Sequence, residues 1–271
     1  MSASGLAALR PDWPAPAKVQ ACFTLRGAGA HDGASAAPYD FFNLGDHVGD
    51  SPAAVAANRQ RLTQAIHARP VFMQQVHGVR VAELVPDSAD GAQADAAVTH
   101  HRGVACTVMV ADCLPVLFTN RAGTVVAAAH AGWRGLAGGV LEQTLEQLRA
   151  LALVHSAREA MKTEATEILA WLGPCIGPSA FEVGAEVRDA FLDTDPGAQG
   201  CFQTLGAGKF LADLPALARR RLSAQQVAQV WGNDGSARWC TVTQREHYFS
   251  YRRDQATLGG SGRMAACIWL T

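Results

Sequence analysis

Short apolar runs dominate the chain, and most of them have the length of a β-strand. The runs are rich in Val, and Gly, Asp or Pro residues bound them. We predict strands over the following residues: Lys18–Leu25, Val71–His77, Val79–Val85, Ala96–Thr99, Val104–Val110, Val116–Thr119, Thr124–His130, Ile168–Leu172, Val227–Trp231, Arg238–Val242 and Met264–Leu270. So many short strands indicate a fold built mainly on β-sheets.

Helical spacing is confined to fewer segments. A helix is expected to open at Asp50 or Ser51, because Pro52 suits a first turn. Periodic apolar residues predict three more helices, over Leu136–Leu151, Ala185–Phe191 and Leu211–Leu222. We interpret residues 26–50 and 193–208 as loops. Strands outnumber helices too heavily for a doubly wound parallel fold, so we predict an α+β fold with mixed β-sheets flanked by helices.

The N-terminal end differs from the rest of the chain. Residues 1–17 lack a basic start and are interrupted by Pro11, Pro14 and Pro16, so we do not expect a signal peptide. We expect this segment to be a poorly structured lead. No segment of linker-like composition divides residues 18–271, which we interpret as a single domain.

Composition excludes several classes of protein. The 271 residues carry 23 Lys and Arg against 24 Asp and Glu, which argues against a basic nucleic-acid binder. Hydrophobic residues make up 49% and charged residues 17%, which excludes intrinsic disorder. No apolar stretch approaches the roughly 20 residues of a membrane helix. The seven cysteines are odd in number and most lie in apolar runs, which predicts reduced, buried thiols in a cytoplasmic protein.

Three of the apolar runs end in residues that can bind a metal. His77 precedes a Gly turn, Cys113 precedes Leu114-Pro115, and His130 precedes a Gly-containing turn. Two imidazoles and one thiolate suit Zn²⁺ with one coordination position open, and a metal there would lower the pKa of bound water. Residue types alone leave open a purely structural role for each side chain.

Longer motifs run through almost the whole chain. They are Phe42–Gly45, His47–Asp50, Asn58-Arg59, Gln75–Gly78, Ala94–Ala96, Ala111–Val116, Ala129–Gly135, Gly173–Pro178, Phe181–Gly184 and Phe249–Asp254. In content and order they resemble the YfiH family, also called the laccase-domain or multicopper polyphenol-oxidase-like family, whose members are mostly described as purine nucleoside phosphorylases. The chain departs from the family near its end, where Leu258–Ser261 separates Thr257 from Gly262-Arg263; the family usually runs Thr-Gly-Arg directly.

The resemblance implies an enzyme with a metal site. Its metal ligands and catalytic residues would be His77, Cys113 and His130, with zinc as the metal and copper as an alternative. The implied substrates are a purine nucleoside (adenosine, inosine, guanosine or methylthioadenosine) and inorganic phosphate, with adenosine deamination at the same site. No nucleic acid or membrane is expected as a partner.

Five other residues are candidates for substrate binding. Arg134 lies at the predicted start of a helix, where a phosphate is bound favourably, and Arg59 and Arg252 compete with it for this role. Asn43 is a candidate for hydrogen bonding to ribose or base, and Phe249 for stacking. Two of these residues have an alternative without a function in binding. Phe249 could be an aromatic residue of the core, and Arg134 could be a solvated side chain.

Other functions remain open on the sequence. A copper-dependent polyphenol oxidase needs roughly ten His or Cys ligands and His-x-His pairs, whereas this chain has nine His and no such pair. A cysteine-type hydrolase that edits peptidoglycan precursors would use Cys113 as its nucleophile beside His77 or His130. A non-catalytic protein with a structural metal is disfavoured by the open fourth position.

Overall fold

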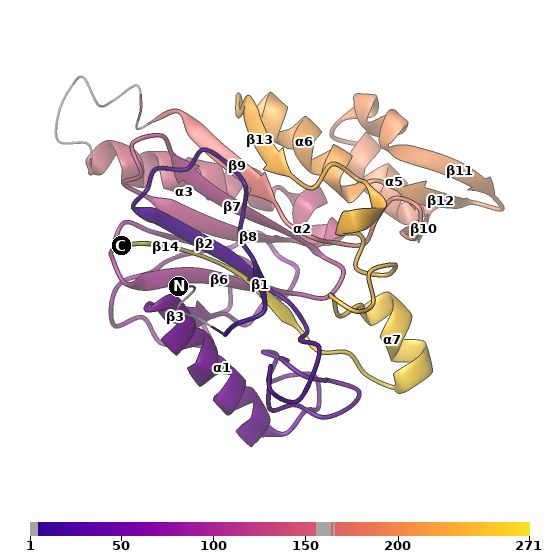
Figure 1. The fold of residues 1–271 in the computed structure, drawn as a ribbon. Coiled ribbons are helices and arrows are strands. Elements are labelled where there is room, and N and C mark those ends of the chain that lie inside the picture. Colours follow the sequence, from indigo (N-terminus) through magenta and orange to yellow (C-terminus); the bar gives the residue numbers. More distant parts are fainter. Residues whose placement is uncertain (1–4, 156–163, 165) are drawn as a thin grey trace.

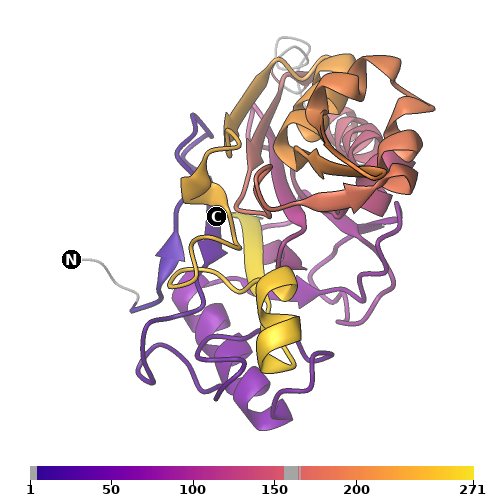
Figure 2. The same cartoon turned by 90° about the vertical axis from the view of Figure 1, so that its right-hand side faces the viewer.

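Two large β-sheets pack face to face, and helices cover their outer sides (Figures 1 and 2). The computed structural model describes residues 5–155, 164 and 166–271, so residues 1–4 of the N-terminal lead lie outside the described part. Parallel and antiparallel neighbours occur in both sheets. The predicted α+β fold with mixed sheets is confirmed.

The order of strands in the sheets does not follow the order of the sequence. The first sheet has the order β1 (Ala8–Leu9), β2 (Val19–Thr24), β14 (Met264–Leu270), β6 (Val104–Val110) and β3 (Arg69–Phe72). The second has the order β13 (Gln229–Gly232), β9 (Ile168–Leu172), β7 (Leu114–Asn120), β8 (Val126–Ala131), β5 (Ala96–Thr99) and β4 (Val81–Glu83). A small third sheet consists of β10 (Glu182–Gly184), β12 (Lys209–Ala212) and β11 (Phe202–Gly206).

Helices lie on both outer sides of the sandwich. Helix α1 (Pro52–Ile66) covers the first sheet, and α3 (Val140–Val154) and α6 (Leu214–Ala224) lie on the side of the second (Figure 1). The shorter elements are α2 (Trp133–Gly138), α5 (Ala185–Leu192), α7 (Tyr251–Leu258), and the 3₁₀ helices η2 (Pro196–Cys201) and η3 (Ala237–Trp239). None of the described helices has the length and apolarity to cross a membrane.

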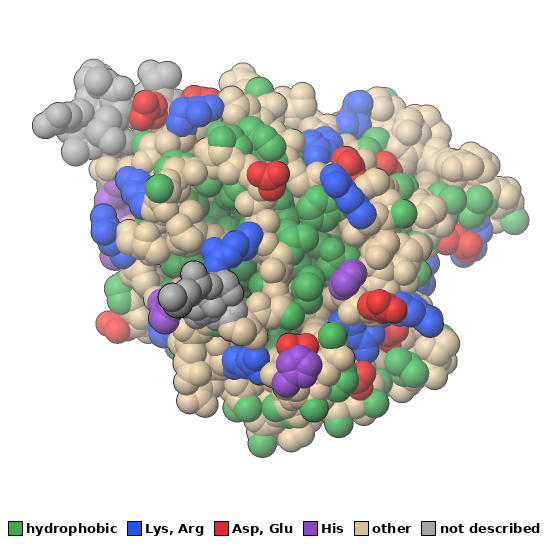
Figure 3. Space-filling model, in the orientation of Figure 1, with side chains coloured by type: hydrophobic (Ala, Val, Ile, Leu, Met, Phe, Trp, Pro, Cys, Tyr) green, Lys and Arg blue, Asp and Glu red, His purple; other side chains and the backbone are tan. Residues whose placement is uncertain are grey.

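The central strands are buried on both faces, which explains their continuous apolar runs. Along β6, Cys106, Val108 and Val110 face the second sheet, whereas Ala105 and Met109 face α1. Along β8, Val126 and Ala128 face the first sheet, while Ala127 and Ala129 face α3. On the outside, Lys and Arg are interspersed with Asp and Glu over the face in Figure 3. All seven cysteines are free.

Several predicted elements need correction. The strand predicted over Arg238–Val242 is wrong, because η3 occupies Ala237–Trp239. The helix predicted over Leu136–Leu151 is two helices, divided at Gly139, whose φ of 99° no other residue type adopts readily. The helix predicted from Leu211 begins at Leu214, where Asp213 caps it by accepting a hydrogen bond from Ala216 N.

Some elements were not predicted at all. The expected loop over residues 193–208 contains η2 and β11, and α7 follows Ser250, whose side chain accepts a hydrogen bond from Arg253 N. Within the N-terminal lead, β1 pairs antiparallel with β2. These short elements depend on contacts with distant parts of the chain, which local periodicity does not record.

Candidate metal centre

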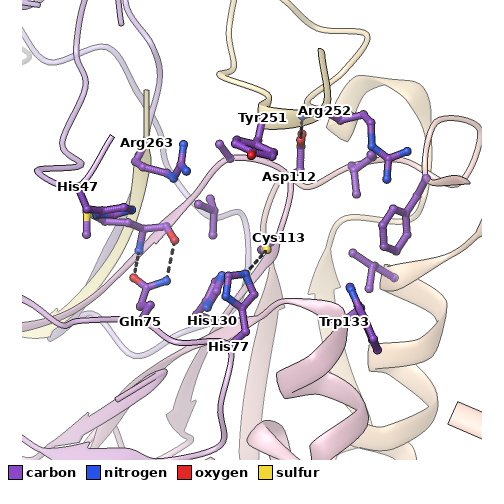
Figure 4. A pocket seen from close by; sticks show the side chains of 16 residues that line it. His47, Gln75, His77, Asp112, Cys113, His130, Trp133, Tyr251, Arg252 and Arg263 are labelled. Carbon is purple, nitrogen blue, oxygen red and sulfur yellow. Dashed lines mark hydrogen bonds between the residues drawn. The ribbon is translucent and has the colours of Figure 1, made fainter. Parts of the chain in front are cut away.

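The three predicted ligands meet at one end of the sandwich, where the chain crosses between the sheets. His77 lies in the connection from β3 to β4, and Cys113 in the turn from β6 to β7. Both connections leave the first sheet and enter the second, and they bring their side chains to His130 of β8 (Figure 4). The ligand atoms lie within 4.8 Å of one another, and Cys113 Sγ is 3.6 Å from His77 Nε2.

Asp95 organises two of the three ligands. Its carboxylate accepts hydrogen bonds from the backbone N–H groups of Val76, His77 and Gly78, at 3.1, 2.8 and 2.8 Å. These bonds hold the turn in which His77 has a left-handed φ of 60°. The same carboxylate lies 2.9 Å from His130 Nδ1, so this nitrogen carries the proton and Nε2 faces Cys113 and His77. The pair is buried.

Gly132 leaves the space in which the ligands meet. A Cβ on this residue would lie 2.7 Å from His77 Cδ2 and 3.1 Å from Cys113 Sγ. Its φ of −62° and ψ of 155° suit any residue, so the glycine is needed for close approach and not for its backbone freedom. The turn between β8 and α2 is therefore shaped around the three ligands.

The electrostatics of the site favour a thiolate. Burial raises the pKa of Cys113, but the charge of His130 and hydrogen bonds to His130 and His77 outweigh this effect and lower the pKa to about 6. Burial lowers the pKa of His130, but attraction to Cys113 and the hydrogen bond to Asp95 outweigh it and raise the pKa to about 9. The two side chains therefore favour the thiolate form of Cys113 and the protonated form of His130 in each other.

Asp112 and Gln75 fix the two crossing segments. Asp112 has a φ of 92°, and its carboxylate accepts hydrogen bonds from Thr241 Oγ1 at 2.6 Å and from Arg252 N at 2.7 Å. It therefore points away from the ligands and holds the turn that presents Cys113. The Gln75 side-chain amide accepts a hydrogen bond from Met109 N at 2.7 Å and donates one to the Met109 carbonyl at 2.8 Å. These bonds attach the connection from β3 to β4 to strand β6.

A cavity of about 470 Å³ opens in front of the three ligands. Trp133, Ile176, Phe181 and Leu214 give it an apolar wall, and His47, Tyr251, Arg252 and Arg263 also line it. In Figure 4, Trp133 lies to one side of the ligands, and His47 and Arg263 to the other. Arg252 lies on the side of Trp133, with its guanidinium 5.8 Å from the centre of the Phe181 ring. A ligand in the cavity would thus find one arginine on each side of the three side chains.

Of the five substrate-binding candidates, only Arg252 lines this cavity. Phe249 is fully buried in the core between the sheets. Arg134 is exposed, with its guanidinium 4.3 Å from the centre of the Trp133 ring, and α2, which it helps to start, has only 6 residues. These positions give Phe249 and Arg134 no direct contact with the cavity.

The other two candidates lie behind the cavity wall. Asn43 is fully buried, and its Oδ1 accepts hydrogen bonds from Gly45 N at 2.9 Å and from Arg263 N at 2.8 Å. Arg59 donates from Nε to Leu44 O at 3.0 Å and lies 4.0 Å from the centre of the Phe72 ring. Both residues support the segment that carries His47.

Asp95, Gln75 and Arg263 also belong to the site, although none of them was a predicted site residue. Asp95 and Gln75 lie inside motifs that carry the family resemblance, so the motifs signalled them without indicating a role. Arg263 lies where the chain departs from the family, and its place in the cavity follows only from the structure.

Comparison with known proteins identifies the family. A family model described as multi-copper polyphenol oxidoreductase laccase matches residues 20–271. The chain belongs to this laccase family. A purine nucleoside phosphorylase of Pseudomonas aeruginosa is 48% identical over 263 residues, covering 97% of this chain and 98% of the relative. The purine nucleoside phosphorylase YfiH of Escherichia coli is 48% identical over 262 residues, covering 96% and 97%.

Solved structures agree with this membership of the laccase family. The crystal structure of a Neisseria meningitidis protein superposes with a TM-score of 0.85 at 46% identity, over 97% of this chain and 98% of the other. YlmD from Geobacillus stearothermophilus gives a TM-score of 0.80 at 29% identity, over 98% and 97%. The resemblance drawn from the motifs is confirmed.

The donor set of this laccase-family chain fits a single metal ion. One thiolate and two imidazoles are ligands that Zn²⁺ and Cu²⁺ both accept. The Asp95–His130 contact is the support that metal-binding histidines usually have. Gly132 leaves room beside two of the ligands.

Proposed function

We propose that this protein is a metal-dependent purine nucleoside phosphorylase that also deaminates adenosine. The observation that carries the proposal is the position of His77, Cys113 and His130 at the edge of a cavity with an apolar wall and two arginines. The names of the relatives support the phosphorylase part. We further propose that the metal is zinc and that its ligands are His77, Cys113 and His130. We also propose that the protein lies in the cytoplasm, where thiols stay reduced.

Each ligand is prepared by a neighbour in this chain. Asp95 keeps the proton on His130 Nδ1, so that Nε2 is the nitrogen available to the metal. The same carboxylate fixes the His77 turn, and the low pKa of Cys113 provides the thiolate. A metal bound there supplies a Lewis acid and lowers the pKa of a water molecule.

Phosphorolysis requires a dry site for the purine and a cationic site for phosphate. A phosphate oxygen forms a bond to C1′ of the ribose, the C1′–N9 bond breaks with its electron pair on nitrogen, and the purine takes up a proton. Trp133, Ile176 and Phe181 provide an apolar surface for the purine. Arg252 is the one substrate-binding candidate for which we propose direct contact; Asn43, Arg59, Arg134 and Phe249 would act by supporting the cavity.

The same cavity would serve deamination and several purines. In deamination a water oxygen bonds to C6 of adenine and ammonia leaves, giving inosine. Adenosine, inosine, guanosine and methylthioadenosine share a purine and a ribose ring, so the apolar wall alone does not separate them.

The deciding experiment is incubation of the zinc-loaded protein with adenosine, with and without phosphate. We expect adenine and ribose 1-phosphate only when phosphate is present, and inosine in both cases. Chromatography resolves adenine, inosine and hypoxanthine. Adenosine recovered intact in both conditions would contradict the proposal.

A cysteine-type hydrolase, such as one that edits peptidoglycan precursors, is the second candidate function. It is favoured by the Cys113–His77 contact of 3.6 Å and by the thiolate state of Cys113. If Cys113 is instead a metal ligand, iodoacetamide should alkylate it slowly in the zinc-loaded protein and faster after chelation. Chelation should abolish nucleoside turnover, and a trapped acyl-enzyme on Cys113 would establish the hydrolase.

A multicopper oxidase, the activity named by the family model, needs several metal sites. Among the described residues, His77, Cys113 and His130 form one group able to hold an ion. Oxygen consumption with a polyphenol in the copper-loaded protein tests this alternative directly.

A further inference from the structure

Two arginines line the cavity without a carboxylate partner among the described residues. Other arginines behind the cavity are paired: Arg26 with Asp40 at 3.2 Å, and Arg253 with Asp254 at 2.6 Å. Arg252 and Arg263 form no such ion pair within residues 5–155 and 166–271. Their charges are thus available to an anion that enters the cavity.

Arg263 is the deeper of the two. It is half-buried, whereas Arg252 is exposed and donates from Nη2 to Glu182 O at 3.1 Å. Nη1 of Arg263 donates to Ser261 O at 2.9 Å and to Gly262 O at 3.1 Å. Its Nε and Nη2 form no hydrogen bond to the described residues, so one edge of the guanidinium is free to bind two oxygens of an anion.

The backbone of Arg263 and the start of its side chain are fixed by residues 43–45. Its N–H donates to Asn43 Oδ1 at 2.8 Å, and its carbonyl accepts from Leu44 N at 3.1 Å. A Cβ on Gly45 would lie 2.7 Å from Arg263 Cγ, so the side chain packs closely against this segment. Figure 4 shows the guanidinium pointing into the cavity between His47 and Tyr251. Such a preorganised cation binds an anion with little loss of side-chain entropy.

The position of Arg263 fits one component of the proposed reaction. Trp133 and Arg263 lie on opposite sides of the three metal ligands. A purine against the apolar wall would therefore leave its sugar between the ligands and Arg263. Building on the proposed function, we propose that Arg263 binds inorganic phosphate and positions it for attack on the ribose. Asn43, a sequence candidate for direct binding, would then be a positioning residue for Arg263.

Titration of inorganic phosphate into the zinc-loaded protein, followed by calorimetry, tests this assignment without turnover. We expect Arg263→Met to weaken phosphate binding about 10- to 150-fold, the effect of losing a charge-assisted contact, and Arg263→Lys to weaken it less. The matched control is Arg238→Met, which removes an exposed arginine paired with Asp234. Zinc content, measured for each variant, checks that the metal site is intact.

Kinetics supply the second readout. For Arg263→Met, KM for phosphate should rise by the same factor, whereas KM for inosine should change much less. Three results would overturn the assignment. Arg263→Met could keep the phosphate affinity of the wild type, or the wild-type protein could bind no phosphate. The third is a larger loss of phosphate affinity in Arg134→Ala than in Arg263→Met. A different result would contradict the proposed function itself. In that case the wild-type protein would bind phosphate but would not cleave nucleosides in a phosphate-dependent way.

Discussion

A single carboxylate holds two of the three candidate metal ligands. Asp95 accepts three backbone hydrogen bonds from the His77 turn and contacts the His130 ring. These contacts keep the pKa of Asp95 low: burial alone would raise it, but the hydrogen bond from His130 and those from the backbone outweigh burial. Asp95 therefore stays ionised and can orient both histidines.

Replacing Asp95 by Asn should separate this role from a purely structural one. Each carboxylate oxygen of Asp95 accepts two of the four hydrogen bonds, and an amide keeps only one accepting oxygen. Two of the four contacts are therefore lost, and the charge beside His130 disappears. We expect zinc affinity to fall about 10- to 100-fold, measured by competition with a chromophoric chelator. Asp87→Asn, at an exposed carboxylate, is the control. Equal zinc affinity in the two variants would refute the orienting role.

At the residue scale, the sequence could indicate the ligands but not their support. His77, Cys113 and His130 follow apolar runs and match motifs, so residue type and position both pointed to them. Asp95 precedes a strand like many surface aspartates, and only the fold brings it to His130, 35 residues further along the chain. Asn43 and Phe249 were singled out by motif alone, and both are fully buried behind the cavity.

At the scale of elements, the turn from β8 into α2 is shaped by the metal centre. Gly132 has an ordinary backbone conformation, so an alanine there costs nothing in φ and ψ. Its Cβ, however, would lie against His77 and Cys113. The ligands would have to move apart.

We therefore expect Gly132→Ala to weaken zinc binding by about tenfold or more while the circular dichroism spectrum stays unchanged. Zinc content after dialysis against a zinc buffer measures the effect. The control is Gly200→Ala, where a Cβ would have no neighbour within 4 Å. If Gly132→Ala and the control bind zinc equally well, the three ligands do not lie as close to residue 132 as in the structure.

Elements were predictable where the local pattern alone decides the conformation. The strands Val104–Val110 and Met264–Leu270 are central and buried on both faces, and their predicted bounds are confirmed. The predicted Leu136–Leu151 helix was wrong in its continuity because one residue, Gly139, takes a left-handed conformation. Short elements such as η3 and α7 depend on caps and tertiary contacts, so no periodicity revealed them.

At the scale of the whole molecule, the metal centre joins the two sheets. His77 and Cys113 lie in separate crossings from the first sheet to the second, and His130 belongs to the second sheet. The sequence could not predict this meeting, because it depends on a strand order in which β6 lies between β3 and β14. A metal bound to all three residues would hold both crossings against β8.

Zinc should therefore stabilise the folded state as a whole. A ligand that binds only the folded state raises the free energy of unfolding by about 2.7 kcal/mol at a free concentration of 100 Kd. Urea unfolding in a zinc buffer at that concentration, compared with unfolding in a chelator, measures the difference. Cys113→Ser should abolish most of the gain, because it removes one of three ligands while leaving the core unchanged. If zinc raised the free energy of unfolding equally in Cys113→Ser and in the wild type, zinc would bind elsewhere. The connections from β3 to β4 and from β6 to β7 would then be held in place without a metal.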